Sequence, residues 1–553
     1  MVKRFISFFF REYKNVHMAA FLLAVSTFAS QILALIRDRI FATQFGPGQV
    51  LDTYYSAFRV PDLLFITIAS LASVTVLAPK LNSFIGTDDK DNTQAKNYLG
   101  NIAKVFSIFM IGCSFLAFLL MPLLAKIVAP GFDASSQAEL VLLSRIMLLS
   151  PIMLGFSNLL SSVTQIYRRF TTYALSPVLY NLGIIIGALF IYPHFGIVGL
   201  AFGVVIGAIM HVGIQVPAVR DLNMTPVFQK KINWSEIYSL AATSLPRTLT
   251  LAFTSIGFLA LTAIASDIGE GSISRMQFAY NLQSVPIAII GLSYGVAVFP
   301  TLTKYFSSGD KTEFSRVLSN SFRHILLWSV PVAVFFVVLR AHIVRVILGA
   351  GEFTWDDTKL TAAAFALFTI SAVFQSLLIL IIRAYYASGT TWKPLKMGLI
   401  ATVVQTILAF VLTKLFLIHP EFGALMSKYL RVTGVPDNEM LMLPLAYTIG
   451  TIINFVFLWG IFKSDLMQKK DLYKIGASLK QILIASLFSG FVVYMMLNIL
   501  ATFFNQDTFK GIFLQGFLSA IVGAIMWGIV LKWFKNEEFS NLYLRFSKKT
   551  GLS

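Results

Sequence analysis

The feature that most constrains this chain is a series of apolar stretches, each long enough to cross a bilayer, that recurs from one end to the other. A helix needs about 20 mainly apolar residues to span the ~30 Å hydrocarbon core of a membrane. Only 13% of the 553 residues are charged, about half the share that is usual in soluble proteins. The sequence therefore predicts an all-α polytopic membrane protein. Continuous apolar blocks also exclude a membrane barrel, whose strands alternate apolar and polar residues.

We identify fourteen such stretches and expect one transmembrane helix from each. They are centred on residues 20–44, 53–79, 98–126, 138–164, 171–192, 195–218, 237–265, 276–302, 318–348, 358–386, 394–418, 441–463, 477–503 and 510–533.

Lysine and arginine alternate between the gaps and so predict the orientation. The N-terminal segment, every second gap and the C-terminal tail together carry 28 basic residues, whereas the intervening gaps carry seven. Cytoplasmic loops are enriched in basic residues, so both termini are predicted to be cytoplasmic. This sidedness, rather than a nucleic-acid partner, accounts for the formal charge of +18.

The polar parts of the chain leave little room for chemistry outside the bilayer. Residues 1–17 lack a cleavage site and are predicted to form an amphipathic cytoplasmic helix. The single cysteine, Cys113, lies in an apolar stretch, and the six histidines have no ligand spacing. No phosphate-binding Gly-Lys loop is present. We therefore expect no catalytic residue, no metal site and no cofactor.

The chain resembles itself at a nearly constant offset, which predicts two parallel repeats. The paired segments are 46–48 with 269–271, 79–81 with 300–302, 127–132 with 347–353, and 167–177 with 385–394. Six spans fit within the offset, so spans one to six repeat as seven to twelve, and parallel repeats of this kind are a transporter architecture. The predicted division is 18–220 for an N-terminal six-helix lobe, 221–236 for a cytoplasmic linker, 237–466 for a C-terminal six-helix lobe, 475–535 for two extra helices and 536–553 for a cytoplasmic tail.

Ionisable side chains within the first two spans mark a candidate site. Arg37 and Asp38 lie in the first span, and Asp52, Ser56 and Arg59 begin the second. Asp52 and Arg59 are seven residues apart, so they share one helix face. A charge inside the membrane is costly and usually faces a cavity or a partner. We expect this face to be lined by water.

Further charged residues lie in later spans. Arg247 follows a proline in the seventh span, the repeat equivalent of the first, and could converge with Arg37. Surplus arginine in a cavity favours an anionic ligand such as phosphate. Arg145, Arg323 and Arg340 fit interfacial anchors that snorkel, and for Arg145 a structural or cavity role stays open.

Residues 36–64, IRDRIFATQFGPGQVLDTYYSAFRVPDLL, resemble the MurJ (MviN) lipid II flippases of the multidrug/oligosaccharidyl-lipid/polysaccharide exporter superfamily. The shared motifs include Arg37-Asp38, residues 45–48 and residues 52–64. Further similarity lies at 129–132, 246–248 and 286–304. In the eighth span an Asp-Arg pair of the family is replaced by Tyr280-Asn281, which makes Asn281 a candidate cavity or structural residue.

The resemblance implies a flippase that moves lipid II from the cytoplasmic to the outer leaflet by alternating access. It places Arg37, Asp52, Arg59 and Arg247 in a cationic cavity for the pyrophosphate head group, and it assigns the last two helices to a groove for the lipid tail. It also implies a location in a bacterial plasma membrane and contact with membrane lipids and with other proteins of cell-wall synthesis. Two alternatives stay open: a flippase for another polyprenyl-linked glycan, such as an O-antigen or capsule unit, and an intramembrane glycosyl- or acyltransferase.

Overall fold

The computed structural model describes residues 16–69, 77, 80–81, 83–84 and 92–541, and the regular elements in these residues are helices. The predicted amphipathic helix at 1–17 lies almost wholly outside the described residues, as does most of the tail. The elements of the first half are α2 (Val16–Phe45), α3 (Gln49–Ala57), α4 (Arg59–Leu64), η1 (Phe65–Ala69), α6 (Thr93–Val128), α7 (Ala134–Met147), α8 (Leu149–Ile166), α9 (Phe170–Ile186), η3 (Gly187–Ile191), α10 (Tyr192–Phe195), α11 (Ile197–Gly213), α12 (Val216–Asp221) and α13 (Trp234–Ser266).

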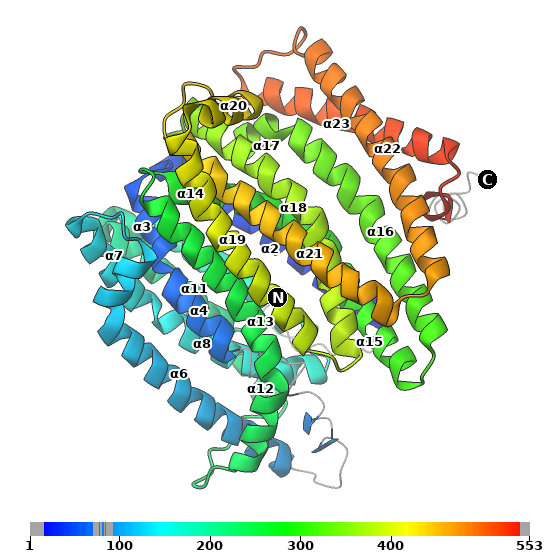
Figure 1. Cartoon of the computed structure of the whole chain (residues 1–553). Coiled ribbons are helices and arrows are strands. Elements are labelled where there is room, and N and C mark those ends of the chain that lie inside the picture. The colour runs from blue at the N-terminus through cyan, green and yellow to red at the C-terminus, as the bar shows by residue number, and fades with distance from the viewer. Residues whose placement is uncertain (1–15, 70–76, 78–79, 82, 85–91, 542–553) are drawn as a thin grey trace, which may run out of the picture. The chain divides into compact units, whose positions relative to one another are not determined.

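The second half continues with helices of similar length (Figure 1). They are α14 (Ser272–Pro286), η4 (Ile287–Leu292), α15 (Ser293–Ser307), α16 (Lys311–Val338), α17 (Arg340–Ile347), α18 (Trp355–Ala387), α19 (Trp392–Ile418), α20 (Pro420–Leu430), η5 (Asn438–Leu441), α21 (Met442–Leu466), α22 (Lys469–Leu500) and α23 (Phe509–Trp533).

The predicted membrane architecture is confirmed. Within the described residues, twelve helical segments are long and apolar enough to cross a bilayer, and they match the third to the fourteenth predicted stretches. The first stretch corresponds to α2, and the second begins with α3, α4 and η1. The count of about fourteen therefore agrees with the helices observed.

The internal repeat is visible in the element boundaries. Ala134 opens α7 where Trp355 opens α18, and Phe170 opens α9 where Trp392 opens α19, so both pairs of helices start at the spacing of the paired segments. The short π-helical segments η1 and η4 begin at the same spacing. A π-helical turn locally breaks the regular hydrogen-bond ladder and is often kept at functional positions. Its recurrence supports the offset deduced from the sequence.

The chain folds into two compact units, residues Met1–Ser274 and Arg275–Ser553. The seventh span, α13, belongs to the first unit by this division. The lobe boundaries deduced from the sequence are based on the internal repeat, whereas the two units are defined by their compactness. The lobe boundaries therefore stay predictions.

In the first unit, α9 and the η3 segment that continues it pack closely against α11 through glycine. A Cβ atom added at Gly203 would lie 2.7 Å from the Cα of Gly187, and one at Gly183 would lie 2.3 Å from the Cα of Gly207. Glycines four residues apart let two membrane helices approach closely enough for dispersion contacts to hold them together. By contrast, α6 exposes a row of large apolar side chains on one face, such as Phe115 and Leu123. That face suits contact with lipid.

In the second unit, the core forms where α16, α18, α21 and α22 meet, and α23 packs on α22 (Figure 1). Fully buried side chains include Phe322 of α16, Tyr385 of α18 and Phe462 of α21. The two helices that follow the repeat are therefore joined to it through α16.

Candidate functional site

Arg37 and Asp38 form a charge pair inside the first unit. The Arg37 guanidinium donates from Nε and Nη2 to Oδ1 of Asp38, at 3.0 and 2.8 Å. It also donates from Nη1 to Oδ1 of Asn181 on α9, at 3.0 Å. Asp38 is 1% exposed. The pair neutralises a charge that the membrane would otherwise penalise, and these bonds use three of the five N–H donors of arginine.

Aromatic side chains connect this pair to Arg59. Tyr55 lies within electrostatic range of Arg37, Asp38 and Arg59. The guanidinium of Arg59 stacks over the ring of Phe258 on α13, with its Cζ 4.6 Å from the ring centroid. A cation over an aromatic face is stabilised by the ring quadrupole, most strongly where water is excluded. The structure therefore gathers Arg37, Asp38 and Arg59 around one tyrosine.

Arg247 lies on the same helix as Phe258. The two residues are eleven positions apart in the continuous helix α13, which corresponds to about three turns, so they share one face at a separation of roughly 16 Å along the axis. Arg59 contacts Phe258, so it lies against the face of α13 that also carries Arg247. The two arginines are therefore at different depths along α13. The predicted convergence of Arg247 with Arg37 stays a prediction.

Asp52 caps the N-terminus of α14, and Glu270, which precedes α14, caps the N-terminus of α3. Its Oδ2 accepts from the backbone N–H of Gly271 at 2.7 Å, and its Oδ1 accepts from that of Ser274 at 2.8 Å. In return, Oε1 of Glu270 accepts from the N–H of Gln49, at the start of α3, at 2.9 Å. The unpaired N–H groups of a helix N-terminus favour a carboxylate. At Asp52 the predicted water-lined face is therefore occupied by the first turn of α14.

The remaining predicted residues lie in three different settings. Ser56 is 1% exposed, and its hydroxyl makes no hydrogen bond to the described residues. Arg145 on α7 donates to the carbonyl of Phe118 at 3.1 Å and stacks on its ring, on the half-exposed side of α6. Asn281 belongs to the second unit and accepts from Gln277 of the same helix at 2.7 Å. These contacts give Arg145 and Asn281 structural partners.

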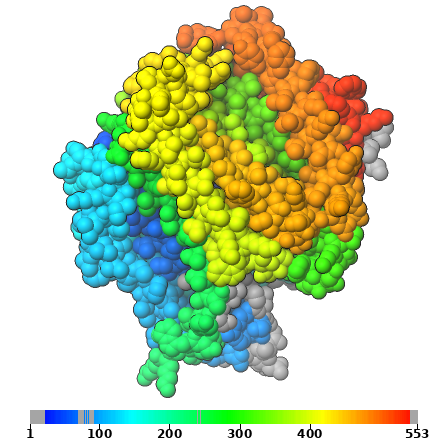
Figure 2. All heavy atoms as spheres, viewed as in Figure 1, coloured from blue at the N-terminus to red at the C-terminus, as the bar shows by residue number. Residues whose placement is uncertain are grey.

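The second unit contains a long apolar groove that residue-level sequence reasoning did not identify. Its volume is about 1290 Å³, larger than the roughly 300–1,000 Å³ of most small-molecule pockets. In Figure 2 it is the hollow between the yellow α20 region and the orange α22, with green atoms of α16 and α17 behind. Apolar side chains from α16, α18 and α22 line most of it: Leu326, Val330, Leu377, Leu483, Leu487 and Phe491. No sequence signal pairs α16 with α22, so the walls could not be named in advance.

Arg323 differs from the expectation that it snorkels to the interface. It is 6% exposed and pairs with Glu537, at 2.8 Å, and with the buried carboxylate of Glu538. Glu538 also accepts from Ser478 on α22 at 2.9 Å. The snorkelling prediction is wrong here because the segment after α23 returns to α16 and supplies the counter-charges. This network clamps the last two helices to the repeat.

Within the described part of the chain, no group of three or more histidine, cysteine, aspartate or glutamate side chains is arranged so that it could hold a metal ion. The geometry is therefore that of a polar cluster with arginine in one unit and of an apolar groove in the other.

Comparison with known proteins identifies relatives over most of the chain. The family model described as lipid II flippase MurJ matches residues 41–514. The lipid II flippase MurJ of Burkholderia cenocepacia is 26% identical over 415 residues, covering 72% of this chain and 79% of the relative. A probable lipid II flippase MurJ of Buchnera aphidicola from Schizaphis graminum is 26% identical over 491 residues, covering 87% and 90%.

Solved structures share the fold. A lipid II flippase MurJ in an inward closed conformation aligns with a TM-score of 0.72 at 22% identity, covering 93% of this chain and 99% of that chain. An inward-facing transporter of the multidrug resistance MATE family aligns with a TM-score of 0.60 at 15% identity, covering 78% and 95%.

Proposed function

Because this chain belongs to the lipid II flippase MurJ family, we propose that it moves lipid II, a polyprenyl-pyrophosphate-linked peptidoglycan precursor, from the cytoplasmic to the outer leaflet by alternating access. The observation that carries the proposal is the family match over residues 41–514, which includes most of the first repeat, the whole of the second and the start of the last helix. The chain is a multi-pass membrane transporter rather than an enzyme, and its substrate is a lipid-linked precursor. Neither alternative cargo nor transferase chemistry is favoured by the relatives named above.

In this proposal the head group binds to the polar cluster of the first unit. Arg37 keeps two N–H donors beyond those used for Asp38 and Asn181, in an orientation fixed by both partners. Arginine matches phosphate oxygens with a planar pair of donors, so a fixed guanidinium suits a pyrophosphate. Arg59 and Arg247, on one side of α13, provide positive charge at two depths along the transport path.

Asp52 takes a positioning role in the proposal. Its carboxylate holds the first turn of α14 through two backbone hydrogen bonds. We assign it to the geometry of the α13–α14 connection rather than to contact with the head group.

The lipid tail is assigned to the groove of the second unit. A polyprenyl chain is flexible and apolar, and the groove offers aliphatic and aromatic walls along α16 and α22. Two further points accompany the proposal as predictions: both termini face the cytoplasm, and other cell-wall synthesis proteins contact the transporter.

The test is complementation of a bacterial strain depleted of its own lipid II flippase. Wild-type protein is expected to restore growth, whereas Arg37→Ala, Arg59→Ala and Arg247→Ala are expected to fail at matched membrane abundance. Arg220→Ala, which removes an exposed arginine of α12, is the matched control and is expected to rescue. Arg37→Lys tests whether the planar pair of guanidinium donors is needed, because lysine keeps the positive charge but lacks that pair of donors.

Two results would contradict the proposal in different ways. No rescue by abundant, inserted wild-type protein would exclude lipid II as the cargo. Rescue by all three alanine variants would leave the cargo in place and remove the arginine cluster from the mechanism.

A further inference from the structure

The two ends of the groove in the second unit differ in polarity. Phe322 and Val338 both line it and are 16 positions apart on α16, so it runs roughly 24 Å along that helix at about 1.5 Å per residue. That length is close to the ~30 Å thickness of the hydrocarbon core. At the Phe322 end the lining side chains are apolar, among them Trp459, Ile475 and Leu479.

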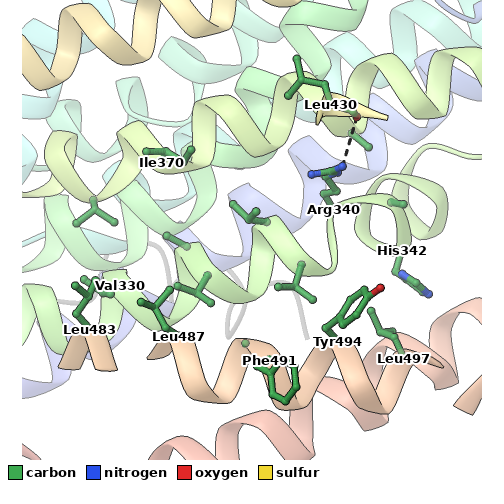
Figure 3. A pocket seen from close by; sticks show the side chains of 18 of the residues that line it. Val330, Arg340, His342, Ile370, Leu430, Leu483, Leu487, Phe491, Tyr494 and Leu497 are labelled. Carbon is green, nitrogen blue, oxygen red and sulfur yellow. Dashed lines mark hydrogen bonds between the residues drawn. The ribbon is translucent and has the colours of Figure 1, made fainter. Parts of the chain in front are cut away.

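The other end is polar and positively charged. Arg340 of α17 and Arg431, which follows α20, line it together with Lys359 of α18. Figure 3 shows Arg340, His342 and Tyr494 at one end of the row formed by Leu483, Leu487 and Phe491. Arg431 lies in one of the gaps opposite the strongly basic ones, which places this end in the outer leaflet by the predicted orientation.

The two arginines at this end have no counter-charge in the described part of the chain. Arg340 donates from Nη2 to the carbonyl of Leu430 at 3.4 Å and makes no ion pair with any described residue. Arg431 lies within electrostatic range of Arg340, so the two positive charges repel each other. Only Lys359 has a carboxylate partner, Asp356, at 2.9 Å. Two like charges at the mouth of an apolar groove therefore favour an anionic ligand.

The backbone of Arg431 adds a second observation. Its φ is 61° and its ψ is 44°, at the C-terminal cap of α20. Glycine is the usual residue in this left-handed conformation, so an arginine there is unfavourable locally. A strained position occupied by a charged residue at a cavity mouth suggests a function for its side chain.

The surrounding aromatic residues match a membrane interface. Trp355 is 56% exposed, Tyr429 is 73% exposed and Tyr494 is 44% exposed, and all three line this end. Tryptophan and tyrosine are enriched at the level of lipid head groups. The site is thus placed at the level of the lipid phosphates, and the groove extends from it into the hydrocarbon core, where it can hold a lipid chain.

From these observations we propose that Arg340 and Arg431 form an outer-leaflet phosphate site that binds the pyrophosphate of a polyprenyl lipid whose chain lies in the groove. The inference rests on the proposed function, because that function supplies the polyprenyl lipid. It adds a second head-group site, on the release side, to the cluster around Arg37. The site retains the flipped lipid until its head group leaves the protein.

The test is native mass spectrometry of the purified full-length protein with undecaprenyl pyrophosphate. The double variant Arg340→Gln/Arg431→Gln is expected to bind roughly tenfold more weakly than wild type, because two charge-assisted contacts to phosphate are lost. Arg340→Lys/Arg431→Lys keeps both charges and is expected to bind within about threefold of wild type. Arg316→Gln, an exposed arginine paired with Glu313 on the opposite side, is the control and is expected to bind as wild type.

Parallel titrations identify the source of the phosphate. Inorganic pyrophosphate alone is expected to bind weakly, since it has no chain for the groove, and phosphatidylglycerol is expected to show no difference between wild type and the glutamine variant. An unchanged affinity of the glutamine variant for undecaprenyl pyrophosphate overturns the inference. An equal loss for phosphatidylglycerol overturns it too, because the groove would then hold a bulk phospholipid.

Growth complementation separates this inference from the proposed function. If wild type rescues but the glutamine variant binds the polyprenyl lipid normally, the outer site is wrong and the flippase function stands. If wild type binds the lipid through both arginines but never rescues, the flippase function is wrong and the site stands. Size-exclusion profiles and melting temperatures of the lysine and glutamine variants are expected to match, so a loss of binding confined to glutamine reports charge rather than unfolding.

Discussion

The sharpest prediction concerns Asp52, because a cap and a ligand contact respond differently to substitution. Asp52→Ala removes the acceptor for two buried backbone N–H groups. A hydrogen bond to a charged group contributes about 1.5–3 kcal/mol, so the loss of two is expected to lower the free energy of unfolding by roughly 3–6 kcal/mol. Asp52→Asn keeps one acceptor but turns an N–H₂ toward the second donor, so we expect a loss of at least about 1.5 kcal/mol.

Glu270 provides a matched comparison, since it makes the reciprocal cap in an exposed position. Its carboxylate accepts a hydrogen bond from the N–H of Gln49. Water can replace an exposed acceptor, so Glu270→Gln is expected to cost less than about 1 kcal/mol. The larger loss is therefore expected at Asp52, whose carboxylate is buried and accepts two backbone hydrogen bonds.

The assay combines thermal unfolding of purified protein in detergent with complementation at matched membrane abundance. The Ala and Asn variants at position 52 are expected to melt at lower temperatures, in that order, and rescue is expected to fall in proportion to the folded protein that remains. An Asp52→Asn protein with wild-type melting but no rescue would falsify the cap assignment. Asp52 would then act on the cargo directly.

Four further predictions follow from other contacts. Arg323→Leu leaves the buried Glu538 without its positively charged partner and is expected to lower stability by roughly 3–5 kcal/mol, with much of the loss recovered when Glu538→Leu is added. Gly203→Leu is expected to abolish recovery of monodisperse protein because its Cβ meets the Cα of Gly187, whereas Gly112→Leu on α6, which has open space around it, is expected to behave as wild type in size-exclusion chromatography. The hydrogen bond from Arg323 holds the pKa of the Glu537 carboxyl below its ordinary value of 4.5. The stabilisation that this ion pair gives is therefore present above pH 4.5 and is lost as the pH falls through the lower pKa of the folded protein. Melting curves of wild type and Glu537→Gln should converge in acid. In a Cys113→Ala background, Thr502→Cys is expected to react with an impermeant maleimide in intact cells, while Ser308→Cys should react only after permeabilisation; the reverse pattern would refute the predicted orientation.

The fold was largely predictable, because the bilayer imposes length and composition on each span. The fourteen apolar stretches and the offset between the repeats correspond to elements of the structure or to their spacing. These signals are local or periodic, so one sequence is enough to detect them. The breaks between helices at Gly46 and Gly271 were also predictable, because these residues belong to the paired segments 46–48 and 269–271. Both glycines have positive φ, of 62° and 85°.

Partner assignments could not be predicted in the same way. The sequence marks Asp52 as a costly charge in an apolar segment, but the backbone amides of Gly271 and Ser274, distant in the chain, satisfy it as well as a ligand would. Arg323 is satisfied by carboxylates of a segment that comes after the last span. A charge in a span indicates that some partner exists, and only the tertiary structure says whether the partner is the protein itself.

That distinction ranks the arginines of this chain. Arg37 pairs with Asp38, Arg275 with Asp357 at 2.7 Å, and Arg323 with Glu538, so in each case a carboxylate lowers the cost of a charge at membrane depth. Arg340 and Arg431 lie at the end of an apolar groove and make no ion pair with any residue that the structure describes. These three arginines lie beside buried carboxylates, whereas Arg340 and Arg431 have no carboxylate within ion-pair distance among the described residues, which favours an anionic ligand there. In the proposed outer-leaflet site the phosphate of the bound lipid supplies the missing negative charge, so the two arginines are neutralised only while the lipid is bound.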